Sequence, residues 1–254
     1  MAAIPKDYLD RLYAGFIGKN VGIRLGAPVE PAIWTYGRIR EIYGEVTSYL
    51  KPFRNFAADD DANGPCFFIR PLLDGDPTKP LEANDVGRAW LDYAREGRGM
   101  FWWGGYGIST EHTAYLNLKA GIPAPESGSI ARNGATVAEQ IGGQIFIDTW
   151  GLVWPGRPRE AAGHAATAAS VSHDGEGTNG ARFIAACIAA AFSHEAVAGL
   201  GPKEKERALL DVVEAGLGQL DSNCLYSGVA KAVIAFHDAH PDDWRPCQEY
   251  LIAE

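Results

Sequence analysis

The sequence has no long apolar run. No stretch of its 254 residues approaches the ~18 consecutive apolar residues of a membrane span. The first residues, MAAIPKDYLDRLYAGF, also lack the basic and then apolar pattern of a secretory signal. We therefore expect a cytoplasmic protein without a membrane partner.

Paired cysteines and basic blocks are absent as well. The four cysteines, Cys66, Cys187, Cys224 and Cys247, lie far apart without a CxxC pair, which excludes a zinc knuckle and a dense disulfide framework. The formal net charge is −9 and no Lys/Arg block offsets it locally, so we expect no nucleic acid partner. An acidic protein that handles a phosphate-bearing metabolite needs local donors or divalent cations.

Repeats, low-complexity tracts and long linkers are missing too, so residues 1–254 are expected to form one domain. Two-residue alternation of β-branched residues is scarce, whereas Ala-rich segments with apolar residues three and four apart recur. This pattern predicts an all-α fold. The predicted helices cover residues 5–23, 34–43, 62–73, 84–96, 109–120, 135–149, 158–171, 176–193, 203–219 and 222–239.

One of these segments predicts a central helix. The residues RFIAACIAAAF, from Arg182 to Phe192, are small and apolar on nearly every side. Such a helix is surrounded by other helices rather than lying on a surface.

Three consecutive carboxylates, Asp59, Asp60 and Asp61, stand in AADDDANGPCFF, just before or within the start of a predicted helix. Their mutual repulsion favours a cation nearby, and carboxylate oxygens suit hard ions such as Mg²⁺ or Mn²⁺. An alternative is an acidic first turn that only complements the helix dipole. The triplet alone does not decide between the two.

A glycine stripe marks the first predicted helix, in GFIGKNVGIRLGAPVE from Gly15 to Glu30. Glycine costs a free helix nearly ~1 kcal/mol relative to alanine, so this spacing predicts a close neighbour and the floor of a site. Glu30 follows Pro28 at the exit of the helix, where its carboxylate could face the same cleft as the triplet. Taken alone, Glu30 would be a surface residue.

A histidine, His173, precedes a Gly-rich loop in SHDGEGTNG. Loops of this kind offer backbone N–H groups to an anionic ligand. The alternative is a histidine that caps a helix or packs in the loop.

Together these motifs resemble the ADP-ribosylglycohydrolase family, which includes the dinitrogenase reductase-activating glycohydrolases and crystallin-like relatives. The resemblance runs from about Tyr13 to Phe192 and includes EHTAY and AEQIGGQIFIDTWGLVWPGRPREAA. It implies a single multi-helix orthogonal bundle that holds two divalent cations, Mg²⁺ or Mn²⁺. These cations orient an ADP-ribose group for hydrolysis from a protein or small-molecule acceptor.

The resemblance also implies roles for individual residues. The family's metal-ligand triplet falls on Asp59, Asp60 and Asp61, with Asp60 also assigned to catalysis, and its gating or basic glutamate falls on Glu30. The implied substrate-binding residues are Ser127, Gly128, Ser129, Asn133, Gly134 and His173.

Three departures from the family pattern are visible. The first triplet position is Asp59 rather than a hydroxyl residue, and Ile23 replaces the usual aspartate of the glycine stripe. No Asp-x-Asp-Thr/Ser/Cys motif, the family's second metal half, follows residue 192. We therefore expect either a C-terminally incomplete hydrolase or a non-catalytic relative that has lost the second half-site and either binds ADP-ribose or has a structural role.

A metal-free glycosidase that uses paired carboxylates, such as Glu30 and Asp60, is a further alternative. Insensitivity to chelators would distinguish it.

Overall fold

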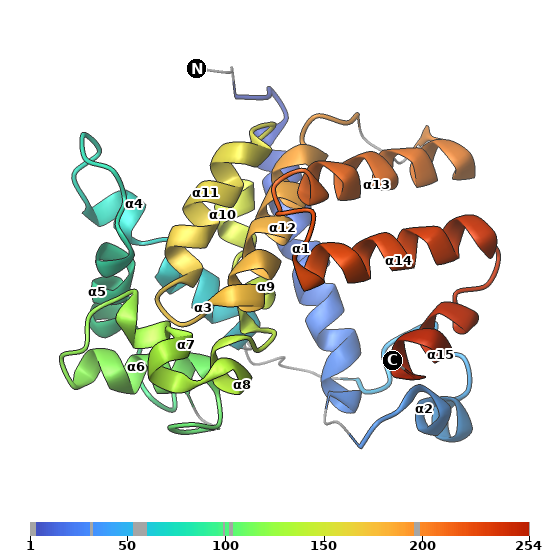
Figure 1. Ribbon diagram of the computed structural model, residues 1–254. Helices are drawn as coiled ribbons and strands as arrows, with labels where there is room; N and C mark the ends of the chain where they lie inside the picture. Colours follow the sequence, from blue (N-terminus) through green and yellow to red (C-terminus); the bar gives the residue numbers. More distant parts are fainter. Residues whose placement is uncertain are drawn as a thin grey trace.

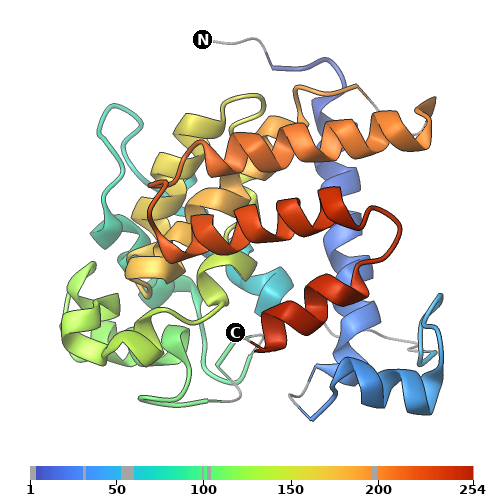
Figure 2. The ribbon, with the colours of Figure 1, turned by 45° about the vertical axis from the view of Figure 1, so that its right-hand side comes forward.

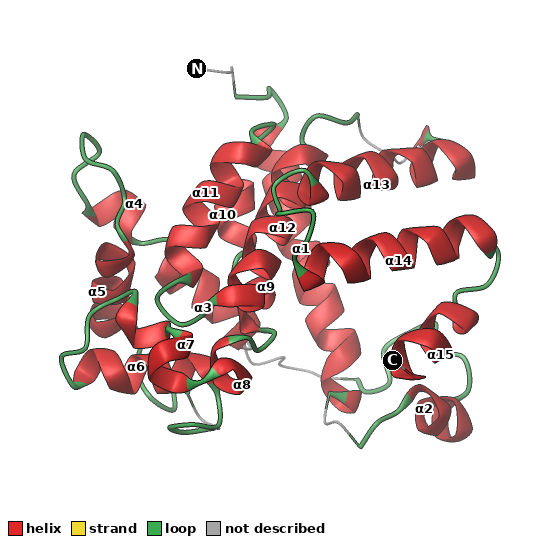
Figure 3. Cartoon of the chain, viewed as in Figure 1, coloured by secondary structure: helices red, strands yellow, loops and turns green. Residues whose placement is uncertain are grey.

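The computed structural model describes residues 4–30, 33–52, 60–98, 100–101, 104–195 and 199–253. In these ranges the regular elements are all helices, and the only β-type pairing is an isolated bridge between Glu96 and Met100 (Figures 1 and 3). The predicted all-α fold is confirmed.

The first half of the chain contains one long helix and several short ones. They are α1 (Tyr8–Gly26), η1 (Ala27–Val29), α2 (Tyr36–Tyr43), α3 (Asp60–Phe68), α4 (Pro71–Asp74), α5 (Ala83–Tyr93), α6 (Thr110–Lys119), η2 (Glu126–Gly128) and α7 (Ile130–Asn133).

The second half contains the longer core helices. They are α8 (Ala135–Ala138), α9 (Gly142–Ile145), α10 (Asp148–Leu152), α11 (Pro158–Ala169), α12 (Gly175–Ala191), α13 (Pro202–Leu217), α14 (Leu225–Ala239) and α15 (Arg245–Ala253).

Helix α12 is the centre of the core, as its composition predicts. It packs against α9, α10, α11 and α13, and Ala181, Ala185 and Ala189 are fully buried. Small side chains let the neighbouring helices approach closely. A Cβ on Gly151 of α10 would lie only 2.6 Å from Cβ of Ile188, so this contact requires glycine.

Aromatic rings fill the space between α3, α5 and α6. Phe68 stacks on Trp90 with ring centroids 4.1 Å apart, and Phe101 stacks on Tyr115 at 4.6 Å. Stacked pairs of this kind contribute beyond the area that they bury, by about 0.5–1.5 kcal/mol. These contacts hold the C-terminal end of α3 against α5 and the middle of α6 against Phe101.

The outer side of the molecule is formed by α13 and α14, which run antiparallel beside each other, with α15 folding back below α14 (Figure 2). None of the helices in the described ranges combines the length and apolar composition of a transmembrane segment.

Two predicted helices differ from those observed. Residues 135–149 form α8, α9 and the start of α10 rather than one helix, and residues 62–73 fall into α3 and α4. Gly142 and Gly143 weaken a continuous helix in the first case. Pro71, which lacks an N–H, starts a new helix in the second. Helix α15 was not predicted.

Candidate active site

The acidic triplet opens α3. Asp59 lies outside the described residues, whereas Asp60 and Asp61 form the first turn of the helix and are partly exposed. Oδ1 of Asp60 accepts a hydrogen bond from the backbone N–H of Asp61 at 3.2 Å. The helix N-terminus favours these carboxylates, because its unpaired N–H groups carry partial positive charge. The carbonyl of Pro65, further along α3, accepts a bond from Thr149 at 3.2 Å and ties α3 to α10.

A third carboxyl group, that of Glu111 in the first turn of α6, lies close enough to be affected by the charge of Asp61. Glu111 is 7% exposed, and burial raises the pKa of its carboxyl to about 7. The negative charge of Asp61 acts in the same direction, while a hydrogen bond to the Glu111 backbone opposes it. At neutral pH this carboxyl is therefore divided between its protonated and ionised forms.

His173 lies against Glu111. Its Nε2 is 3.4 Å from Oε1 of Glu111, and its Nδ1 is 2.8 Å from the hydroxyl of Ser172. The ring is 2% exposed, and burial lowers its pKa to about 3, so the imidazole is neutral at physiological pH. The approach of Glu111 is thus a contact between a carboxyl and a neutral ring, and neither facing atom has a hydrogen bond to any residue that the structure describes. The three side chains form a line from Ser172 through His173 to Glu111.

Two glycines of α9 make room for this line. A Cβ on Gly142 would lie 1.5 Å from Oε1 of Glu111 and 3.1 Å from Cε1 of His173. A Cβ on Gly143 would lie 2.1 Å from the carbonyl oxygen of Gly177 in α12. A side chain at Gly143 would force the backbones of α9 and α12 apart, and one at Gly142 would displace the buried side chain of Glu111. The glycines that interrupt the helical pattern of residues 135–149 are therefore the ones that bring α9 against Glu111.

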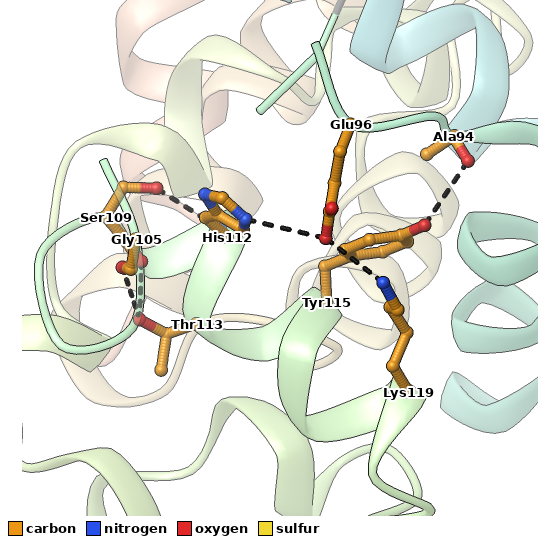
Figure 4. A network of polar contacts seen from close by, with 8 residues as sticks. All are labelled: Ala94, Glu96, Gly105, Ser109, His112, Thr113, Tyr115 and Lys119. Carbon is orange, nitrogen blue, oxygen red and sulfur yellow. Dashed lines mark hydrogen bonds and ion pairs between the residues drawn. The ribbon is translucent and has the colours of Figure 1, made fainter. Parts of the chain in front are cut away.

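A polar network on α6 fixes that helix from another side (Figure 4). Ser109 caps α6 by accepting a bond from the N–H of His112, and Glu96 lies 3.8 Å from Nε2 of His112 and 3.2 Å from Nζ of Lys119. The Tyr115 hydroxyl donates to the carbonyl of Ala94 at 3.5 Å. These contacts hold the helix that carries Glu111.

The predicted substrate loop packs against the segment that carries His173. The buried Ser127 hydroxyl donates to the carbonyl of Val171 at 2.7 Å, and Gly128 lies so close to Ser172 that a Cβ would be 2.4 Å from its carbonyl carbon. The side chain of Asn133 donates to the carbonyl of Ser127 at 2.8 Å. The structure thus brings the loop and His173 together, with Ser127 and Asn133 engaged in internal bonds.

The other two loop residues stand at helix ends. Ser129 caps α7 by accepting a bond from the N–H of Arg132 at 3.2 Å, and Gly134 follows α7 with a positive φ of 79°. Glu30 follows η1 with an exposed side chain that pairs with no described residue. No described contact joins Glu30 to α3, so its proposed role stays a prediction.

Lys19 is a charged residue that the sequence interpretation passed over. Its Nζ lies 2.5 Å from Oδ2 of Asp148 and donates to the carbonyl of Ile145 at 2.9 Å, which ties α1 to α10. The pair borders a cavity of about 310 Å³ that Ala62 of α3 also lines. Burial raises the pKa of Asp148, and the adjacent ammonium opposes that shift.

Comparison with known proteins decides the family. Residues 4–251 match the family model described as ADP-ribosylglycohydrolase. The chain is a member of this family. Searches of curated proteins and of solved structures gave no significant match.

Family membership makes this chain a relative of glycohydrolases that act on ADP-ribose linkages. The oxygen donors at the start of α3 suit a hard divalent cation by their chemistry. However, in the ranges that the structure describes, no three His, Cys, Asp or Glu side chains are grouped so that they could hold a metal ion. Asp60 and Asp61 do not by themselves make up such a group, so their role as metal ligands stays a prediction.

Sequence reasoning did not single out Glu111 or Gly142 as site residues in this family member. Glu111 stands in a helical first turn, where acidic residues are common because of the helix dipole. Only the fold shows that this carboxyl is buried against His173. Gly142 gave a weak signal, because a Gly-Gly pair within a helical pattern indicates close packing or a break.

Proposed function

We propose that this chain is a metal-dependent hydrolase that removes ADP-ribose from a modified protein or from a small-molecule acceptor. The observation that carries the proposal is that the acidic start of α3 and the pair formed by Glu111 and His173 lie near each other. The acidic start of α3 lies within electrostatic reach of Glu111, and Glu111 contacts the His173 that follows the predicted substrate loop.

In this proposal Asp60 and Asp61, with Asp59, hold Mg²⁺ or Mn²⁺. The bound cation would polarise ribose oxygens and orient a water molecule. The Glu111 carboxyl, with a pKa of about 7, can hold or release a proton at neutral pH. Glu30 would gate the cleft or act as a base, and the 127–134 loop with His173 would bind the substrate.

The proposal is tested by calorimetric titration of Mg²⁺ or Mn²⁺ into the metal-stripped protein, with and without ADP-ribose. A variant that carries Asp60→Ala and Asp61→Ala is the control. Saturable binding that the variant loses supports the metal site, and release of ADP-ribose from a modified protein then tests hydrolysis. A folded protein that binds no cation contradicts the metal-dependent reaction.

A second candidate function is ADP-ribose binding without hydrolysis. The observation that favours it is that the described residues contain no group of three potential metal ligands. Two-metal chemistry would be impaired with half of the ligands. Binding of ADP-ribose by calorimetry together with no turnover in the presence of Mn²⁺ would distinguish this function from the first.

A further inference from the structure

A polar groove of about 820 Å³ lies between α11 and α12. Its α12 side is formed by Thr178 and Arg182, and its α11 side includes Thr167. Ser129 and His173, to which the family resemblance assigns substrate binding, also line the groove.

The guanidinium of Arg182 makes no hydrogen bond, ion pair or ring contact with the rest of the described chain. Other arginines of the described ranges without such contacts are exposed: Arg40, Arg88, Arg98 and Arg159. Arg182 differs because it is half-buried in the groove. Partial burial of an unpaired cation costs solvation free energy, and the attraction of a bound anion would offset this cost.

The carboxylates that border the groove are already engaged. Oδ1 and Oδ2 of Asp174 accept bonds from the backbone N–H groups of Gly175 and Ile130, at 2.8 and 3.1 Å. Glu126 forms an ion pair with Arg132. Neither acid pairs with Arg182, so the groove presents a guanidinium to a ligand.

We propose that this groove binds a diphosphate group and that Arg182 is the residue that holds it. A planar guanidinium donates paired hydrogen bonds to phosphate oxygens, which no other half-buried group of the groove can do. A chain with a net charge of −9 repels a phosphate ligand unless it provides such a local donor. That the diphosphate belongs to ADP-ribose rests on the proposed function, because the His173 that contacts Glu111 is also one of the residues that line the groove.

The test is calorimetric titration of inorganic pyrophosphate into the full chain, in the presence of a chelator so that no cation bridges the two. Arg182→Gln removes the charge, whereas Arg182→Lys keeps the charge but loses the planar guanidinium with its paired donors. Arg159→Gln removes an exposed arginine of α11 and is the matched control. Loss of a charge-assisted bond weakens binding by about ten- to a hundredfold. We expect that loss in Arg182→Gln, a smaller loss in Arg182→Lys and none in Arg159→Gln.

Equal binding by the wild type, Arg182→Gln and Arg182→Lys, all with unchanged circular dichroism, overturns the proposal, as does absence of pyrophosphate binding by the wild type. A parallel titration with ADP-ribose identifies the source of the diphosphate. Weaker ADP-ribose binding in Arg182→Gln supports its assignment to the substrate. Unchanged ADP-ribose binding overturns that assignment. A chain that binds pyrophosphate through Arg182 but releases no ADP-ribose contradicts the hydrolase alone and leaves the groove site supported.

Discussion

At the scale of single residues, burial determines the chemistry of the site more than local sequence does. Glu111 and His173 are both charged or chargeable side chains, yet burial favours the neutral form of each. Their opposite pKa shifts also make stability depend on pH in opposite directions.

Glu111→Gln is expected to gain stability relative to the wild type as pH rises. The ordinary pKa of 4.5 is raised to about 7 in the folded protein, so burial of the neutral carboxyl stabilises the fold below about pH 4.5. That contribution is lost as pH rises through about 7, and glutamine does not ionise. By pH 8 the wild type should have lost about 3 kcal/mol of unfolding free energy relative to Glu111→Gln, since each pKa unit corresponds to ~1.4 kcal/mol. Urea unfolding at pH 5 and pH 8 measures it, and an equal difference at both pH values would contradict the shift.

Gly142→Ala is expected to destabilise the fold, because its Cβ would lie 1.5 Å from Oε1 of Glu111. Overpacking of this kind costs about 1–3 kcal/mol. The control is Gly22→Ala in α1, where a Cβ meets no atom of the described residues within 4 Å, in contrast to the close neighbour that the glycine stripe predicts. It should stabilise the protein by about 0.5–1 kcal/mol. Chemical denaturation of both variants, and of Gly142→Ala combined with Glu111→Ala, tests the cause. If the loss in Gly142→Ala comes from the collision, truncating Glu111 should recover part of it.

At the scale of elements, the site depends on how short helices are held against α12 and α1. The Lys19–Asp148 pair joins α1 to α10, and both side chains are largely buried, at 15% and 21% exposure. Removing one member of a buried pair leaves an uncompensated charge, whereas removing both does not.

Lys19→Met is therefore expected to lower the free energy of unfolding by more than Lys19→Met combined with Asp148→Asn. We expect a loss of about 1–3 kcal/mol for the single variant, below the 3–5 kcal/mol of fully buried pairs because some solvent reaches this one. Urea unfolding of the wild type, the two single variants and the double variant completes a double-mutant cycle. This cycle gives the coupling energy between Lys19 and Asp148. Additive losses would show that the ammonium and carboxylate do not depend on each other.

The elements also show how far the sequence predicts this fold. The long helices α11 to α14 follow directly from apolar periodicity, because small apolar residues three and four apart have few other ways to be buried. The break at Gly142 and the burial of Glu111 depend on contacts between α6, α9 and α12. Such contacts join residues distant in sequence, so local pattern could not place them. The acidic start of α3 was predicted, whereas its proximity to Glu111 was not.

At the scale of the whole molecule, the net charge of −9 and the acidic start of α3 together bear on cation binding. Any salt weakens general repulsion between surface carboxylates, since ions screen exposed charges. The stabilisation that comes from a specific cation site must therefore be measured apart from the stabilisation that comes from screening.

Mn²⁺ or Mg²⁺ is expected to raise the melting temperature of the whole chain beyond the effect of NaCl at equal ionic strength. A ligand present at about a hundred times its Kd stabilises the folded state by about 2.7 kcal/mol, which for a chain of this size corresponds to several degrees. Asp60→Asn combined with Asp61→Asn should remove the increment that is specific to the divalent ion and leave the NaCl effect unchanged. Differential scanning calorimetry of both proteins measures the two effects. If the variant keeps the full divalent increment, the cation binds elsewhere and the metal site at α3 is contradicted. If Mn²⁺ and NaCl act alike on the wild type, the stabilisation is only screening of the acidic surface.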